Sequence, residues 1–268
     1  MSEQPAARVI ALRIDVKATL DEVWKALTTA EGLARWFPPQ AATVPGPGGT
    51  LTLSWGPGEE WVAPIVAWEP HAHLGIVGDA ARSLAVDFHL EANGEIVTVR
   101  LVHSGFDESE SWDDYIDGLT AGWTYFLANL RHVLERHPGT RRAMLSARPS
   151  CRGTVADGSR AVFGAGGLDV RPGIDALGVG DRCSLLLGGE RFEASVLVAL
   201  PPRAVAFVLS DLNDALLFVE REGLQPNYRL GIWLSLYGVA PERVERMRQA
   251  VDSLASALAV REAPVPRA

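Results

Sequence analysis

Apolar residues alternate with polar ones in residues 8–16 and again between residues 50 and 104. This two-residue period is typical of β-strands. The stretches that show alternation or a short apolar run are 8–16, 50–55, 61–68, 74–77, 83–91 and 95–104. Gly and Pro residues separate them, and Asn93-Gly94 is a strong hairpin signal. Consecutive strands joined by short turns predict an antiparallel meander.

Two short helices are predicted before the meander. Thr19 and Glu22 have the spacing of a capping box ahead of the apolar positions of 20–27. A second helix is predicted over 31–36, where Pro38 then stops it. These helices follow the first strand and precede the others.

A long helix is predicted after the meander, from Trp112 to Arg136. Its apolar residues recur every three or four positions and so form one stripe. His137-Pro138-Gly139 ends it. A helix of about seven turns needs a large apolar surface to cover its stripe, and the concave face of the sheet provides one.

The order of strands followed by a helix returns in the second half of the chain. The paired stretches are 51–56 with 183–188, 61–70 with 192–201, and 97–105 with 230–238. The three offsets are 132, 131 and 133 residues, a drift that single-residue insertions and deletions in loops explain. This predicts a duplicated domain; the alternative is two unrelated β stretches in accidental phase. A closing helix is predicted from Pro241, a favoured first helical residue. The opening of the second copy, 159–163, is predicted to be a poor helix among glycines.

We therefore predict an α+β protein with two tandem helix-grip domains, each a curved antiparallel sheet wrapped around a long C-terminal helix. The first domain is predicted over residues 8–137 and a second, degenerate copy over 153–262. Between them, residues 138–152 are rich in Arg and are interrupted by Pro149, so we predict a linker there.

The first half also carries short motifs in a distinctive order. They are Val23-Trp24, Leu33-x-x-Trp36-Phe37, Trp68-Glu69-Pro70 and Gly122-Trp123. Together they resemble the activator of heat-shock-protein-90 ATPase homologue branch of the SRPBCC/START-like superfamily. The resemblance implies a cavity between sheet and helix that binds hydrophobic small molecules, and most bacterial members have no known reaction. The second half lacks the Trp-Glu-Pro and Gly-Trp motifs.

The candidate ligand-binding residues are those expected to face this cavity. They are Trp36, Phe37, Trp55, Phe88, Leu101, His103, Leu119, Trp123 and Phe126. Aromatic side chains bring large apolar area, and Trp adds an N–H donor, although plain core packing explains such residues as well. His103 shares the phase of Val99 and Leu101, so it points inward. There it could orient a ligand carbonyl, act as an acid or base, or be a hydrogen-bonded core residue.

The charge and the cysteine content indicate which binding partners and which cellular compartment the sequence is compatible with. The formal net charge is −8, with 9 Lys and Arg against 19 Asp and Glu in residues 1–137 and 16 against 14 in the rest. An acidic first half without a basic stripe argues against binding to nucleic acid or to anionic membranes. No apolar run approaches the roughly 18 residues of a membrane span. The two cysteines form no CxxC pair, which favours reduced thiols and a cytoplasmic location.

No cofactor or metal is expected from the sequence. It contains no GxGxxG or P-loop and no Gly-x-Ser-x-Gly elbow. His71 and His73 flank a turn, and such an i, i+2 pair without a carboxylate partner is a weak signal for a metal site. Asp87 and His89 are expected to be solvated, opposite Phe88.

The predicted function is that of a binding protein for a small hydrophobic or aromatic molecule. One alternative is an aromatase/cyclase-like enzyme that uses the same cavity. The other is a co-chaperone-like interaction module, in which the acidic stretch 107–110 meets a protein partner, or a homodimer.

Overall fold

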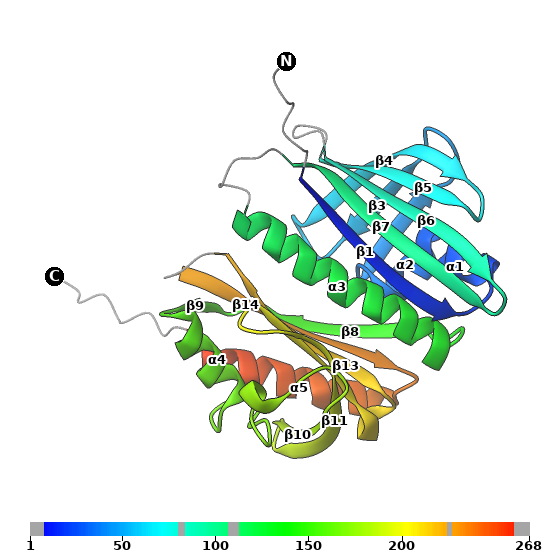
Figure 1. Cartoon of the computed structure of the whole chain (residues 1–268). Helices are drawn as coiled ribbons and strands as arrows, with labels where there is room; N and C mark the ends of the chain where they lie inside the picture. Colours follow the sequence, from blue (N-terminus) through cyan, green and yellow to red (C-terminus); the bar gives the residue numbers. More distant parts are fainter. Residues whose placement is uncertain (1–7, 80–83, 107–112, 224–226, 260–268) are drawn as a thin grey trace. The chain divides into compact units, whose positions relative to one another are not determined.

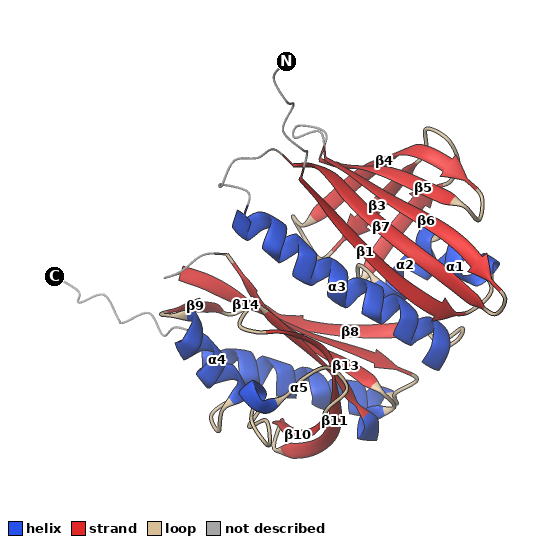
Figure 2. Ribbon diagram, viewed as in Figure 1, coloured by secondary structure: helices blue, strands red, loops and turns tan. Residues whose placement is uncertain are grey.

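The computed structural model describes residues 8–79, 84–106, 113–223 and 227–259. The chain divides into two compact units, Met1–Arg142 and Ala143–Ala268. Each unit combines an antiparallel β-sheet with helices (Figures 1 and 2). The predicted α+β class with tandem helix-grip units is therefore confirmed.

The first unit holds a seven-stranded sheet in the order β1-β7-β6-β5-β4-β3-β2. Its elements are β1 Arg8–Lys17, α1 Leu20–Thr28, α2 Ala30–Trp36, β2 Gln40–Val44, β3 Thr50–Ser54, β4 Glu60–Glu69, β5 His73–Asp79, β6 Leu84–Asn93, β7 Ile96–Phe106 and α3 Asp113–Arg136. Helix α3 packs along the sheet beside β1 (Figure 1). Strand β2 was not predicted. The acidic stretch 107–110 lies outside the described residues.

Local signals set the short helices of this unit. The predicted capping box is present: Thr19 Oγ1 accepts from Glu22 N at 3.2 Å, and Glu22 Oε2 accepts from Thr19 N at 2.8 Å. Helix α2 follows directly, because Thr29 Oγ1 accepts from Gly32 N at 3.0 Å. A Cβ on Gly32 would lie 2.1 Å from Lys25 O, so only glycine permits this close approach of the two helices.

The Arg35 side chain of helix α2 forms hydrogen bonds with the backbone at the end of α3. Its Nη2 donates to His137 O at 2.7 Å, and its Nε donates to Thr140 O at 3.1 Å. These carbonyls lie at the end of α3 or just beyond it, where helical partners are missing. The interaction holds the last residues of α2 against α3, and those residues are Trp36 and the cap residue Phe37.

The second unit repeats the topology. Its main sheet has the order β10-β11-β12-β13-β14-β8, with β9 paired to β14. Its elements are β8 Arg142–Ala147, β9 Ser150–Arg152, α4 Val155–Phe163, η3 Ile174–Ala176, β10 Arg182–Leu187, β11 Glu190–Leu200, β12 Ala204–Leu209, η4 Ser210–Leu212, β13 Ala215–Glu222, β14 Asn227–Tyr237 and α5 Pro241–Leu258. Strands β3 to β7 and helix α3 thus have counterparts in β10 to β14 and α5, in the same order.

The structure bears on two expectations for this half. The opening of the second copy, expected to be a poor helix, lies in α4. A second capping box explains it: Thr154 Oγ1 accepts from Asp157 N at 3.2 Å, and Asp157 Oδ2 accepts from Thr154 N at 3.2 Å. The predicted domain limits stay a prediction, but β8 and β9 occupy most of the stretch 138–152 assigned to a linker, because both pair with β14.

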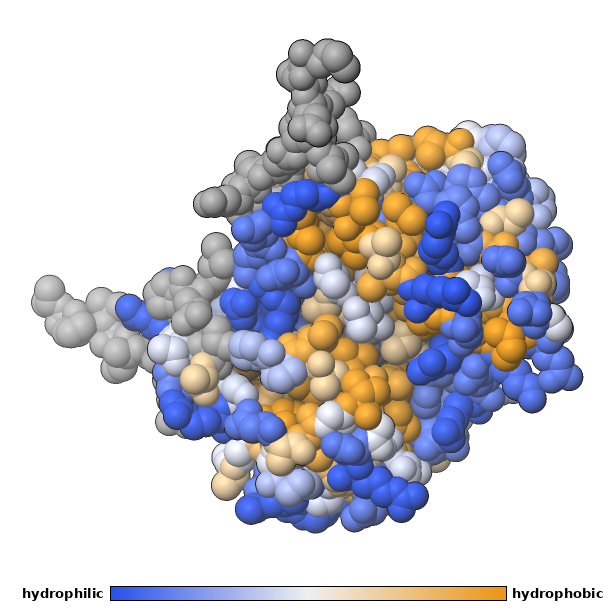
Figure 3. Space-filling model, in the orientation of Figure 1, coloured by the Kyte–Doolittle hydropathy of each residue, from blue (hydrophilic) through white to orange (hydrophobic). Residues whose placement is uncertain are grey.

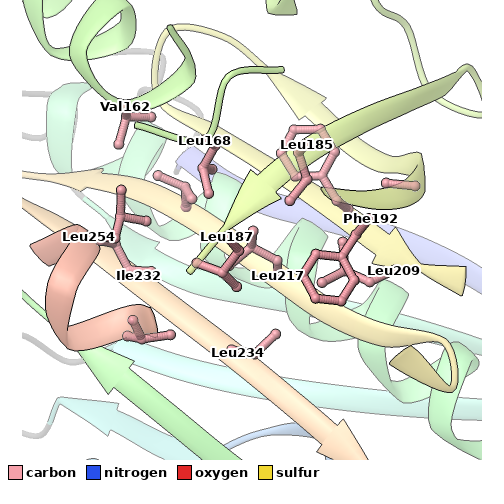
Figure 4. Close-up of a cluster of buried hydrophobic side chains, with 14 of the residues drawn as sticks. Val162, Leu168, Leu185, Leu187, Phe192, Leu209, Leu217, Ile232, Leu234 and Leu254 are labelled. Atoms are coloured by element: carbon pink, nitrogen blue, oxygen red, sulfur yellow. The ribbon is translucent and has the colours of Figure 1, made fainter. Parts of the chain in front are cut away.

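Aliphatic side chains fill the core of the second unit (Figure 4). Leu185, Leu217, Ile232 and Leu234 are fully buried there, with Phe192 as the large ring among them. Burying such side chains stabilises a fold by about 1.5–3 kcal/mol each. The interior of this unit is therefore a packed core.

Both cysteines are free and buried in this same core. Burial and the charge of Glu193 raise the pKa of the Cys183 thiol to about 11, and burial also raises the pKa of Cys151. Because the thiolate is the nucleophile, we expect the folded chain to react very slowly with a disulfide reagent at pH 8. Denaturant should expose two rapidly reacting thiols. Rapid reaction of either thiol in the folded protein would contradict this burial.

The surface mixes hydrophilic and hydrophobic side chains on the face shown in Figure 3. Exposed apolar residues include Val62 and Val66, which alternate with buried positions along β4. Among the described residues, no helix combines the length and apolarity required to cross a membrane.

Candidate functional site

An aromatic cluster lies between the sheet and helix α3 of the first unit, and Phe37 is at its centre. The Phe37 ring centroid is 5.1 Å from that of Trp36, in a stacked arrangement, and 5.1 Å from Trp123. Edge contacts join it to Trp55 at 5.3 Å and Phe126 at 4.7 Å. Residues from α2, from the end of β3 and from α3 thus meet around one ring.

Trp36 anchors this cluster at the α2 end. Its side chain is fully buried, and its Nε1 donates to Ala26 O at 2.9 Å. Asn129 of α3, also fully buried, donates from Nδ2 to Trp36 O at 2.8 Å. Both polar groups are satisfied, which a buried site requires.

Trp123 connects the cluster to a buried histidine on β7. Its ring centroid is 5.9 Å from Phe88 and 6.3 Å from His103. The Trp123 Nε1–H donates to His103 Nδ1 at 3.1 Å. Because Nδ1 accepts, the neutral imidazole carries its proton on Nε2.

His103 Nε2 is buried and has no hydrogen-bond partner among the residues that the structure describes, and the whole residue is only 4% exposed. A buried donor left unpaired costs about 1–3 kcal/mol. Burial lowers the pKa of His103 to about 4, so the ring is neutral at pH 7. The site therefore offers one neutral N–H donor inside an aromatic environment.

The surroundings of this donor are small or apolar. A Cβ placed on Gly78 would lie 3.3 Å from His103 Nε2 and 3.2 Å from Leu84 Cβ. On another side the Phe106 ring centroid lies 4.8 Å from that of the imidazole. Glycine at position 78 thus leaves space beside the donor that any side chain would reduce.

Most of the predicted residues are brought together. Rings of Trp36, Phe37, Trp55, Phe88, Trp123 and Phe126 contact one another, and His103 joins through Trp123. Leu119 instead packs against a neighbouring group formed by Ile10, Leu84 and Phe106. Leu101 is fully buried on β7. Their assignment to ligand binding stays a prediction.

Phe106, Gly78 and Asn129 are site residues that the sequence interpretation missed. The strict alternation of β7 would turn Phe106 outward, yet it is only 2% exposed. A bulge explains the difference: Ile10 pairs with His103 and Arg8 with Phe106, so β7 has one extra residue. Gly105, with φ of 96°, was the available signal, since glycine inside a strand often marks a bulge.

The second unit lacks these features at the equivalent positions. Leu187 stands where the repeat places Trp55, and Leu236 stands where it places His103. Both leucines are buried, 2% and 1% exposed. Only the first of the two copies has a polar group at this place on the strand before the long helix.

Residues 17–135 match the family described as Activator of Hsp90 ATPase homolog 1-like protein. This match supports a fold of the same type for the first unit. No functionally curated protein matches the chain. The predicted resemblance of the first unit to this family is thereby confirmed at the level of the fold.

Solved structures similar to the chain include single-unit and full-length matches. The Aha1 dimer from Colwellia psychrerythraea is 23% identical, with a TM-score of 0.44, over 49% of this chain and 98% of that one. DynU16, a putative protein in the dynemicin biosynthetic locus, is 20% identical, with a TM-score of 0.41, over 93% of this chain and 96% of that one. CalU16 from Micromonospora echinospora is 26% identical, with a TM-score of 0.39, over 46% of this chain and 74% of that one.

Proposed function

We propose that the first unit binds a small aromatic or hydrophobic molecule that carries a hydrogen-bond acceptor, such as a carbonyl or phenolic oxygen. The observation that carries this proposal is the buried Nε2 of His103, for which no residue in the described part of the chain provides a hydrogen-bond partner. Among aromatic rings, a ligand oxygen there would satisfy the donor, while the ligand's apolar part would contact the rings.

Binding requires the aromatic rings to move, because they already contact one another. Trp36, Phe37, Phe88 and Trp123 are at most 5% exposed, whereas Trp55 and Phe126 are only partly buried. The partly buried rings can turn away at the smallest cost in buried area. Entry is therefore expected beside Trp55 and Phe126, and not through the fully packed end at Trp36.

The neutral state of His103 favours binding over acid catalysis. With a pKa of about 4, the imidazole holds a single ring proton at pH 7, on Nε2. A neutral imidazole donates a hydrogen bond but is a very weak proton donor. Its role in this proposal is to orient the oxygen of the ligand.

Matched ligands test the proposal. We expect 2-acetylnaphthalene to quench tryptophan fluorescence saturably and to bind about 3- to 10-fold more tightly than 2-ethylnaphthalene, which has no acceptor. His103→Phe keeps a ring but removes the donor, so the two ligands should then bind equally. Gly78→Ala, which crowds Nε2, should also weaken the acetyl compound selectively.

His89→Phe is the matched control, because it makes the same change on the outer face of the same sheet. It should leave the preference for the acetyl compound unchanged. Absence of saturable binding by either compound, or an unchanged preference in His103→Phe, would reject the proposal.

A further inference from the structure

Three side chains with metal-binding chemistry project together from the first sheet. Strands β5 and β6 pair so that His73 stands opposite His89 and Gly75 stands opposite Asp87. Neighbouring residues of both strands, such as Leu74 and Phe88, are buried in the interior. Because side chains alternate along a strand, His73, Asp87 and His89 share the opposite, outer face.

The three side chains are already close enough to converge on one ion. His73 Nε2 lies 2.7 Å from Asp87 Oδ1, and the rings of His73 and His89 stack with centroids 4.3 Å apart. One donor atom from each residue lies within 4.8 Å of the other two. Donors around one zinc ion lie about 3.4 Å apart, so a modest turn of the side chains closes the gap.

Gly75 allows the carboxylate to take this position. A Cβ there would lie 2.9 Å from Asp87 Oδ1 and 2.9 Å from Ala67 Cβ. With no side chain at position 75, the carboxylate of Asp87 can reach across the neighbouring strand towards His73. Any other residue would push it away.

The surroundings leave the three ligands accessible to an ion from solvent. The side chains of His73 and Asp87 are 21% and 29% exposed. His73 and His89 line a surface hollow together with Glu69 and Arg100.

We propose that His73, Asp87 and His89 bind a divalent transition-metal ion of the zinc class, with the remaining coordination position open to water. Two imidazoles and one carboxylate form a donor set that suits Zn²⁺, Co²⁺, Ni²⁺ or Cu²⁺. Mg²⁺ and Ca²⁺ prefer oxygen donors and are excluded by the same reasoning. When the ion binds, the ring proton that joins His73 Nε2 to Asp87 Oδ1 moves to Nδ1, so that the Nε2 lone pair can bind the metal.

This inference reverses the expectation that the chain has no metal site. In the sequence, His73 is separated from Asp87 and His89 by 14 and 16 residues, and the last two were expected to be solvated. Only the pairing register of β5 with β6 places them side by side. The site is independent of the aromatic cluster, which lies on the other face of the sheet.

Zinc titration of the untagged, chelator-treated full chain tests the proposal. We expect one Zn²⁺ per chain with a dissociation constant in the micromolar range or below, measured by competition with a chromophoric chelator. Co²⁺ should give the visible absorption of a site with fewer than six ligands. His89→Ala and Asp87→Asn should each weaken Zn²⁺ binding about 10-fold or more.

His71→Asn is the control, because it removes an exposed histidine two residues from His73, at a left-handed position that Asn tolerates. It should keep the wild-type affinity, and millimolar Mg²⁺ should not compete. NMR of the wild-type chain makes the test independent of variant folding, since Zn²⁺ should shift the ring signals of His73 and His89. Affinities within twofold of wild type in both site variants, or unshifted His73 and His89 signals, would overturn the proposal.

Discussion

Phe37→Ala is expected to lower the free energy of unfolding of the first unit by about 3–5 kcal/mol. Phe37 is 5% exposed and contacts four aromatic rings, with centroid distances between 4.7 and 5.3 Å. Removing its ring takes away transfer energy and leaves a cavity at the point where these rings meet. Tryptophan fluorescence in denaturant measures the change, because seven of the eight tryptophans lie in residues 1–142.

Phe126→Ala is the matched comparison for this substitution. Phe126 contacts the same Phe37 ring but is only partly buried, so its loss should cost clearly less. A cavity at position 37 should also bind small apolar molecules, as dry engineered cavities do. A loss below about 1 kcal/mol for Phe37→Ala would mean that the rings are loosely packed, contrary to the distances given above.

Glu220→Gln is expected to stabilise the second unit at pH 8 by about 2–3 kcal/mol and to have little effect near pH 4.5. Burial, and then the neighbouring charge of Glu222, raise the pKa of the Glu220 carboxyl to about 7. Trp233 Nε1 donates to Glu220 Oε1 at 2.9 Å, which offsets part of this effect. A glutamine keeps that acceptor and removes the charge.

The sign of the predicted change in stability follows from the number of protons bound to the folded and the unfolded chain. Between about pH 4.5 and 7 the unfolded chain releases the proton of Glu220, whereas the folded chain keeps it. The contribution of this group to stability is therefore complete at low pH and is lost as the pH rises through 7. The lowered pKa of His103 makes its own contribution to stability change with pH in the opposite direction. The effect of Glu220 is therefore measured as the difference in the free energy of unfolding between wild type and variant at each pH.

Glu222→Gln provides a contrast on the same strand. Arg148 pairs with the Glu222 carboxylate, donating from Nη2 to Oε2 at 2.6 Å and from Nε to Oε1 at 3.0 Å. Losing this charge should destabilise the unit, because it weakens a two-point ion pair. Opposite signs for two carboxylates two residues apart are therefore expected. Equal pH dependence in wild type and Glu220→Gln would show that Glu220 is not held neutral.

Local patterns along the sequence determined the elements that position the aromatic site. The capping box at Thr19, the Asn93-Gly94 hairpin and the stripe of α3 all depend on residues within a few positions of one another. Alternation along β7 was enough to turn His103 inward. Such signals are readable because backbone period and capping are short-range properties.

Only the tertiary structure decided which of these groups contact one another and how their surroundings change their pKa values. The Trp123–His103 hydrogen bond, the bulge that turns Phe106 inward and the raised pKa of Glu220 depend on contacts between distant segments. The cluster of His73, Asp87 and His89 depends on strand register, and a slip of one residue would send its members to different faces. Local periodicity therefore predicted the face of most side chains on their own strand or helix, and Phe106, beyond the bulge in β7, is an exception. Partners and charge states followed only from long-range packing, which local periodicity does not encode.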